Sequence, residues 1–217
     1  MSVTAQVLFD TPQHEIAPIL RDRLDRCVSA SLVAGFVTPE GVKAILPIIS
    51  ANHTKLEYLV VGAGTYKAFE AMEGLLAAGV PPDRLKVHLG HSRPTEKGAK
   101  NPFYKFHPML HSKIYYLEME DETACAFVGS HNLTSFALLG LNGEAGVLLE
   151  GPKDAEQFES IRQHITQARS QSVIYEPGMK EAYAWWMSEF AEGLKGKVLD
   201  MDRDDEAKKT VVIPVSY

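Results

Sequence analysis

The chain has few cysteines and no long hydrophobic run. Only two of its 217 residues are cysteines, Cys27 and Cys125, and both stand in apolar stretches. We expect buried free thiols in a reducing compartment, because small secreted domains rich in disulfides carry many more cysteines. No apolar run approaches the about 20 residues of a membrane span, and the chain does not start with a basic region followed by an apolar one. These absences predict a cytoplasmic protein that does not enter a membrane.

A net positive charge is absent as well, because 28 acidic residues outnumber 22 basic ones and give a formal charge of −6. Taken alone, this balance argues against a nucleic-acid partner. The segment 84–113 nevertheless carries seven Lys or Arg residues and one acid, so the basic charge is concentrated there. Four of these cations lie in a stretch without helical or strand periodicity, and we predict that they contact phosphates of a nucleic acid. They are Arg93, Lys97, Lys100 and Lys105.

Apolar segments of strand length alternate with amphipathic helical segments over the first 170 residues. We predict strands at 6–9, 31–36, 56–61, 85–89, 111–117, 124–128 and 145–149. Helices are predicted at 15–28, 39–50, 66–78 and 153–170. This alternation is typical of an α/β fold, in which we expect a mixed sheet of about seven strands with helices on both faces. Residues 176–217 form a predicted C-terminal extension, with a helix over 179–194 and a charged tail.

Core packing does not explain one set of polar residues between positions 111 and 144. The set comprises His111, Lys113, Glu118, Ser130, Asn132 and Glu144. His111 and Lys113 project to the same side of a strand, because residues i and i+2 share a face. The Ser130 hydroxyl and the Asn132 amide follow a strand end, where they could surround a phosphate together with the Lys113 ammonium. A nitrogen nucleophile, donors for phosphate oxygens and carboxylates to orient the imidazole together indicate phosphodiester cleavage.

These residues resemble the signature of the phospholipase D superfamily, which is H-x-K, four residues, an acid, and then G-S-x-N. Here it reads HSKIYYLE from position 111 and GSHN from position 129, with Glu144 downstream. The resemblance is closest to the short, single-motif bacterial nucleases and restriction endonucleases. Glu118 departs from the pattern, since the family usually has Asp there. A second H-x-K at positions 53–55 lacks the acid and the G-S-x-N, and we interpret it as coincidence.

The resemblance implies a role for each residue of the motif. His111 would attack phosphorus and form a phosphohistidine, and Glu144 would hold the other nitrogen of its ring. Lys113, Ser130 and Asn132 would stabilise charge on the pentacoordinate phosphorus, while Glu118 would be mainly structural. No metal or other cofactor is required, and residues 1–175 would be the catalytic domain.

The resemblance also implies a homodimer. Cleavage in this family takes two histidines, because one attacks and another protonates the leaving oxygen. This chain carries one copy of the motif, so two chains would face each other across a two-fold axis and share one composite site. The acid that protonates the leaving group would then be His111 of the partner subunit.

Two other kinds of site fit the sequence less well. A zinc site built on His107 and His111, with His88 and His91 nearby, would need a helix at 107–111, and Pro108 disfavours one. The glycines at 62 and 64 lack the rest of a dinucleotide-binding fingerprint. We therefore predict no metal ligands. His131 occupies the variable position of G-S-x-N, and we interpret it as a bystander.

The basic segment and the short form of the motif favour a nuclease, with DNA favoured over RNA. A role in a restriction or antiphage defence system, where a partner protein would supply sequence recognition, is a hypothesis from the family. One alternative is a phospholipase D-type lipid phosphodiesterase, but no amphipathic helix rich in Lys or Arg is present to bind a membrane. The other alternative is a non-catalytic nucleic-acid-binding module, which the complete polar set disfavours.

Overall fold

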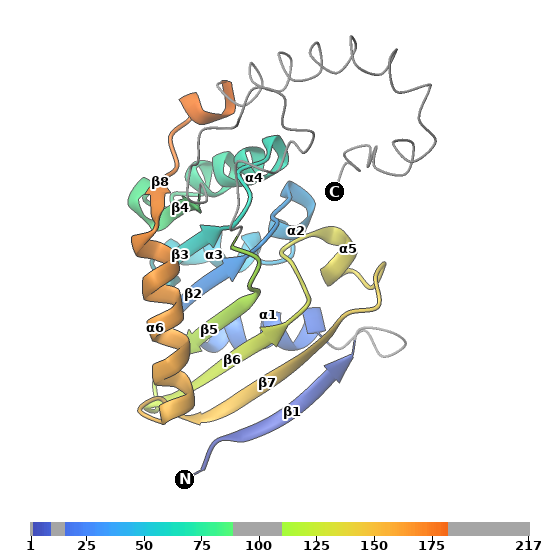
Figure 1. Cartoon of the computed structure of the whole chain (residues 1–217), viewed down its shortest axis with the longest axis vertical. Helices are drawn as coiled ribbons and strands as arrows, with labels where there is room; N and C mark the ends of the chain where they lie inside the picture. Colours follow the sequence, from blue (N-terminus) through green and yellow to red (C-terminus); the bar gives the residue numbers. More distant parts are fainter. Residues whose placement is uncertain (1, 10–15, 89–109, 182–217) are drawn as a thin grey trace, which may run out of the picture.

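In the computed structural model, which describes residues 2–9, 16–88 and 110–181, a mixed eight-stranded sheet has the order β1-β7-β6-β5-β2-β3-β4-β8 (Figure 1). Strands β2, β3 and β4 run parallel, and every other neighbouring pair is antiparallel. The strands are β1 (Thr4–Phe9), β2 (Ser29–Ala34), β3 (Leu56–Val61), β4 (Leu85–His88), β5 (Ile114–Glu118), β6 (Thr123–Gly129), β7 (Ala145–Pro152) and β8 (Ser172–Ile174).

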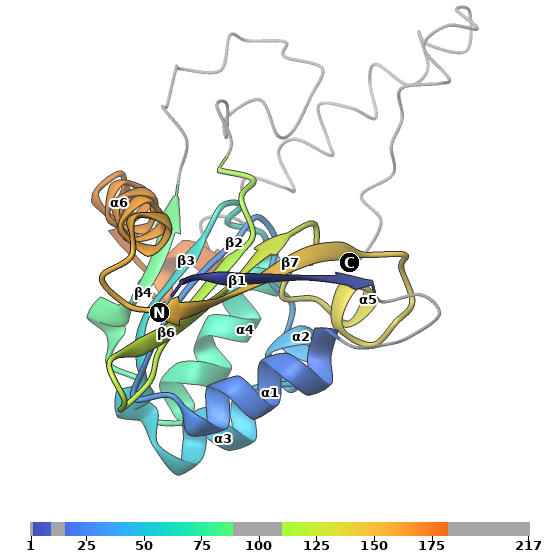
Figure 2. The same ribbon diagram turned by 90° about the horizontal axis from the view of Figure 1, so that it is seen from below.

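Helices cover both faces of this sheet, which confirms the predicted fold class (Figure 2). The α-helices are α1 (Ile16–Arg26), α2 (Pro39–Val42), α3 (Leu46–Ala51), α4 (Tyr66–Ala77), α5 (Ser135–Leu138) and α6 (Glu156–Ser170). Two short 3-10 helices, His53–Lys55 and Pro82–Arg84, lead into β3 and β4. Helices α1 to α4 lie on one face, and α6 lies on the other.

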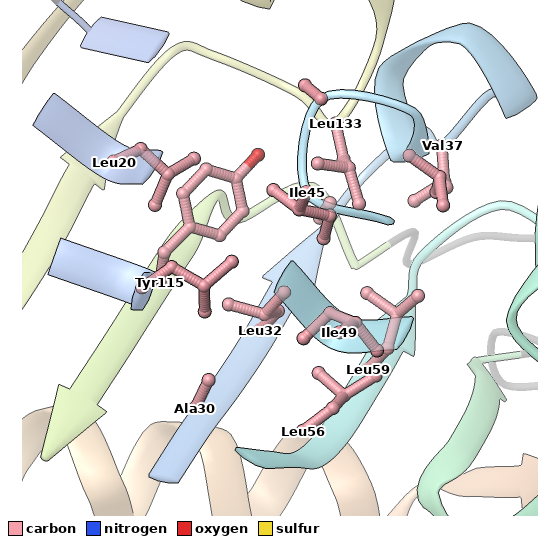
Figure 3. Packing of buried hydrophobic residues seen from close by; sticks show 14 of the residues in the cluster. Leu20, Ala30, Leu32, Val37, Ile45, Ile49, Leu56, Leu59, Tyr115 and Leu133 are labelled. Atoms are coloured by element: carbon pink, nitrogen blue, oxygen red, sulfur yellow. The ribbon is translucent and has the colours of Figure 1, made fainter. Parts of the chain in front are cut away.

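The larger core fills the space between the sheet and α1, α3 and α4. Leu20 of α1 and Ile49 of α3 are buried there with Leu32, Leu59 and Tyr115 of the sheet (Figure 3). A smaller core lies under α6, whose Phe158, Ile161 and Ile165 pack with strand residues such as Ile114 and Tyr116. Side chains along β5 therefore alternate between the two cores, as the two-residue period of a strand requires.

Three local features differ from the sequence prediction. The helix predicted at 39–50 is divided into α2 and α3, because Pro47 near the start of α3 lacks the amide hydrogen that a continuous helix would donate to the carbonyl of Lys43. Residues 111–113, predicted as the start of a strand, precede the ladder, which begins at Ile114. The third feature is β8, three residues long, which pairs with β4 and was not predicted.

The chain after β8 runs toward α4. Tyr175 is buried and stacks on Phe69, with ring centroids 5.5 Å apart. Lys180 pairs with Glu73 of α4 at 2.7 Å. Residues 178–181 are helical, while the rest of the predicted C-terminal helix, the charged tail and the four cations of the basic segment lie outside the described residues. The domain boundary at 175 therefore stays a prediction.

Cys27 and Cys125 are both buried and free, as predicted. Within residues 2–9, 16–88 and 110–181, no helix is long and apolar enough to cross a membrane.

Candidate active site

Three segments that are distant in sequence meet beside the ends of β2, β5 and β6. Gly35 and Phe36 follow β2, residues 111–113 precede β5, and residues 130–132 follow β6. The backbone N–H of Gly129 donates to the carbonyl of Lys113 at 3.2 Å. The backbone N–H of Phe36 donates to Oδ1 of Asn132 at 2.9 Å. The order of the strands therefore brings the H-x-K half and the G-S-x-N half of the motif side by side.

Gly35 lies where these three segments meet. A Cβ atom at Gly35 would lie 3.0 Å from Cδ2 of His111, 3.3 Å from Oδ1 of Asn132 and 3.3 Å from Nζ of Lys113. The imidazole, the amide and the ammonium thus converge on one point. Gly35 belongs to no sequence motif, although a glycine inside a predicted strand often marks a close approach.

Lys113 is the buried cation of the site, with 6% of its surface exposed. Its Nζ lies 2.9 Å from Nδ1 of His111 and also donates to the His111 carbonyl. Burial lowers its pKa to about 8, although the negative charge of Glu144 acts in the opposite direction. Within the described residues, no carboxylate oxygen lies within 4.0 Å of the Lys113 ammonium to form an ion pair. A bound anion would therefore stabilise the charged form of this side chain.

His111 is exposed, and its ring contacts Phe36 edge to face with centroids 5.8 Å apart. Partial burial, and then the Lys113 charge, lower the pKa of His111 below its usual value of 6.5. The imidazole is therefore neutral at neutral pH, which is the form that can act as a nucleophile. Nδ1 faces Lys113, so Nε2 is the ring nitrogen on the other side.

Asn132 presents the nitrogen end of its amide to the site. Its Oδ1 already accepts the hydrogen bond from the Phe36 backbone, and this contact determines the orientation of the amide. The two N–H groups on Nδ2 are then available as donors toward a phosphate. The turn that carries Asn132 is held by the Tyr115 hydroxyl, which donates to the carbonyl of His131 at 2.9 Å.

Glu144 binds Ser130 and not His111, which differs from the predicted contact. The Ser130 hydroxyl donates to the Glu144 carboxylate, and Nδ2 of Asn142 donates to its other oxygen at 3.2 Å. The cause is local: the Ala145 backbone N–H donates to Ser130 Oγ at 3.1 Å, which brings the preceding residue beside the hydroxyl. The expected partner of the His111 ring is thus replaced by Lys113 in this structure.

Glu118 lies at the far end of β5. The rise of about 3.3 Å per residue along a strand places it about 16 Å from Lys113. Its carboxylate accepts a hydrogen bond from the Tyr116 hydroxyl at 3.0 Å. That hydroxyl also accepts one from Arg162 of α6 at 2.9 Å. Tyr116 thus links β5 to α6, and Glu118 bonds to Tyr116 and does not join the polar group around His111; its structural role stays a prediction.

His131 is buried, with 1% of its surface exposed, and its ring lies beside those of Tyr115 and Phe127. Its ring covers the paired glycines Gly129 and Gly146, where a Cβ would lie 3.0 Å and 2.7 Å from Cε1. In the described part of the chain neither ring nitrogen has a hydrogen-bond partner, and burial lowers the pKa to about 4. A neutral His131 therefore packs behind the turn that presents Ser130 and Asn132.

We predicted no metal ligands, and only some of the histidines considered for a metal site lie within the described residues. His88 is buried at the end of β4, whereas His91 and His107 lie outside the described residues. Within the described ranges no group of three or more His, Cys, Asp or Glu side chains could hold a metal ion. The cations Arg93, Lys97, Lys100 and Lys105 also lie outside those ranges.

No model of a known protein family matches the sequence, and no curated protein matches it either. Solved structures do match. Nuc from Salmonella typhimurium, a phospholipase D family member, aligns with a TM-score of 0.57 and 19% identity over 81% of this chain and 99% of its own. NucT from Helicobacter pylori aligns with a TM-score of 0.54 and 11% identity, over 80% of this chain and 100% of its own.

A longer protein shares the fold. Phosphatidylserine synthase from Haemophilus influenzae Rd KW20 aligns with a TM-score of 0.51 and 14% identity, over 92% of this chain and 48% of its own. At such identities the likeness concerns the fold alone. With its mixed sheet, its helices on both faces and these matches, the chain has the phospholipase D fold.

Proposed function

We propose that this chain is a phosphodiesterase of the phospholipase D family that works without a metal ion. The observation that carries the proposal is the convergence of His111, Lys113 and Asn132 on one point above Gly35. An ammonium and an amide N–H pair would bind the non-bridging oxygens of a phosphate there. A neutral imidazole lies beside them as the nucleophile.

The first step is the attack of Nε2 of His111 on phosphorus. In the resting site Nδ1 faces the Lys113 ammonium at 2.9 Å. A bound phosphate competes for this ammonium and draws it away, so that Nδ1 can carry the ring proton and Nε2 its lone pair. The N–P bond forms while the bond from phosphorus to the leaving oxygen breaks. Lys113, Asn132 and Ser130 stabilise the charge that develops on the equatorial oxygens.

The leaving oxygen must take up a proton. This chain has one copy of the motif, so the proton would come from His111 of the partner subunit in a homodimer, where the bound phosphate anion would hold that imidazole in its protonated form. Water then attacks phosphorus, the N–P bond breaks, and the water's proton returns to the same partner imidazole. Light scattering tests the dimer: a monomer that is fully active would contradict the composite site.

The proposed substrate is nucleic acid, with DNA favoured over RNA. The support is the basic segment of the sequence, with four of its cations outside the described residues, and the short single-motif form. A role within a defence or restriction system, with a further protein partner, extends the proposal. The likeness to phosphatidylserine synthase supports a lipid phosphodiesterase as the second candidate.

A panel of substrates separates these candidates. The full-length chain is incubated with plasmid DNA, single-stranded DNA, RNA and phosphatidylcholine vesicles, each with and without excess EDTA. We expect DNA cleavage that persists in EDTA. Cleavage of phospholipid without cleavage of DNA would favour the lipid candidate, and activity that is lost in EDTA and restored by a divalent metal would contradict metal independence.

Two histidine variants give the panel a matched comparison. His111→Ala should abolish turnover while leaving cooperative unfolding intact, because the side chain is exposed. His53→Ala removes the first histidine of the other H-x-K triplet, which is also exposed and lies in a 3-10 helix before β3. Its activity should equal that of the unmodified chain. Full activity in His111→Ala would remove the proposed nucleophile.

A further inference from the structure

Ser112, between the proposed nucleophile and the buried lysine, faces the opposite side of the sheet. The even-numbered residues that follow it on β5, Ile114 and Tyr116, belong to the core under α6. The odd-numbered Tyr115 and Leu117 belong to the core on the other face. Ser112 continues the even series and points to α6.

The partner of Ser112 on α6 is His164. Ser112 Oγ lies 2.9 Å from Nε2 of His164. His164 lies within the 15-residue α6, next to the buried Ile165 and between the turns that carry Ile161 and Ala168. This histidine is therefore attached to a helix that is held against the sheet by its apolar face, and His111 lies on the other side of the strand from it.

Within the described residues, backbone contacts hold the segment before β5 on either side of Ser112. The Gly129 N–H donates to the Lys113 carbonyl at 3.2 Å. The Leu110 carbonyl lies against Gly62, where a Cβ would lie 1.8 Å from its oxygen. The Ser112–His164 contact falls between these two points, at the residue that joins His111 to Lys113. Loss of it would remove the side-chain contact that the described residues provide at the middle of this segment.

We propose that His164 is a positioning residue for the reaction. Through Ser112 it fixes the backbone between His111 and Lys113, and so the direction in which the imidazole and the ammonium point. His164 does not contact the phosphate, because it lies on the opposite face of the sheet. The inference rests on the proposed function for its kinetic consequence, but the coupling of His164 to His111 can be measured without any activity.

The kinetic test compares three variants on bis-p-nitrophenyl phosphate. His164→Ala should lower kcat by about 10- to 100-fold, since displacement of a reacting group by about 1 Å can cost about 100-fold. His164→Gln should retain most of kcat, because its amide can reach the Ser112 hydroxyl. Ser112→Ala should match His164→Ala, and the double variant should be no slower than either single one, because the two residues act through one contact.

A matched control lies one turn along the same helix. Gln167 is exposed on α6, and Gln167→Ala should leave kcat unchanged. A merely structural role for His164 would lower the melting temperature without lowering kcat at a temperature where the variant is folded. A kcat loss of the same size in His164→Gln as in His164→Ala, or additive losses in the double variant, would overturn the proposal.

The second readout does not depend on turnover. The ring nitrogens of His111 are followed by NMR in ¹⁵N-histidine-labelled protein, where their shifts report the tautomer and the contact with Lys113. The His111 signals should move in His164→Ala and in Ser112→Ala, and stay in place in His164→Gln. Unchanged His111 signals in both alanine variants would overturn the proposal even if the chain proved to have no phosphodiesterase activity. An inactive chain with shifted signals would contradict the proposed function and support the coupling.

Discussion

Replacing Gly35 with alanine would place a methyl group at the centre of the proposed phosphate site. The new carbon would lie 3.0 Å from His111 Cδ2 and 3.3 Å from both Lys113 Nζ and Asn132 Oδ1. All three distances are shorter than ordinary van der Waals contact, so the neighbours must move by a few tenths of an ångström. Each of them is a side-chain atom, and none is backbone. The change therefore displaces the reacting groups more than it disturbs the fold.

The expected magnitudes follow from this geometry. Overpacking a site costs about 1–3 kcal/mol of unfolding free energy, and we expect the lower end, about 1 kcal/mol, because flexible side chains absorb the strain. Catalysis should suffer more, since the methyl group occupies space that phosphate oxygens need and shifts both nucleophile and clamp. We expect kcat/KM for bis-p-nitrophenyl phosphate to fall by about 100-fold or more.

Gly74 of α4 supplies the matched control, because a Cβ there would meet no side chain or neighbouring element within 4 Å. Gly74→Ala should leave kcat/KM unchanged and raise the unfolding free energy by about 0.5–1 kcal/mol, as expected for glycine to alanine inside a helix. Both variants are measured by urea unfolding and by steady-state kinetics. Gly35→Ala with the kcat/KM of the unmodified chain would refute the location of the phosphate.

Three further predictions concern charge. First, kcat/KM should fall at acid pH, at a point below 6.5, where the attacking His111 becomes protonated. It should also fall at alkaline pH, where the partner's imidazole is harder to protonate and where, above about pH 8, the free enzyme loses the Lys113 proton; a flat profile up to pH 10 would contradict this. Second, burial lowers the pKa of Lys113 in the folded chain to about 8, from its ordinary value of 10.5. Between these two pH values the unfolded chain binds more protons than the folded chain, so the free energy of unfolding should rise with pH. Lys113→Met should then be more stable than the unmodified chain at pH 7 and lack this rise, which urea unfolding at several pH values would show. Third, alanine at Arg93, Lys97, Lys100 and Lys105 should weaken DNA binding and flatten its salt dependence by about 0.9 per lost phosphate contact, while cleavage of bis-p-nitrophenyl phosphate survives; an unchanged slope would mean that this segment does not bind phosphates.

The sequence predicts those parts of the site that lie within one hairpin. His111 and Lys113 precede β5, and Ser130 and Asn132 follow β6, so the β5–β6 hairpin alone brings them together. Gly35 could not be found in this way, because it follows β2, which lies outside the hairpin. Its place beside the motif results from the antiparallel pairing of β2 with β5, a contact between segments about 80 residues apart along the chain.

Other residues escaped the sequence analysis for related reasons. His164 lies on α6, and its contact with Ser112 depends on how that helix crosses the sheet. His131 was interpreted as a bystander, and its deep burial depends on the paired glycines of β6 and β7, which leave room for its ring. The predicted Glu144–His111 contact was wrong for this structure. The backbone N–H of Ala145, at the start of β7, donates to Ser130 Oγ, and this hydrogen bond places Glu144 beside Ser130. Local patterns predicted the elements, and the pairing of distant strands determined these contacts.

Trapping of the covalent intermediate tests the central claim most directly. The chain is mixed with bis-p-nitrophenyl phosphate, quenched in alkali within one turnover, digested, and examined by mass spectrometry for an acid-labile phosphoryl adduct. We predict an adduct on His111, at the nitrogen remote from Lys113, with release of p-nitrophenol in equal amount. Turnover without any adduct on His111, or an adduct on a different residue, would contradict the account.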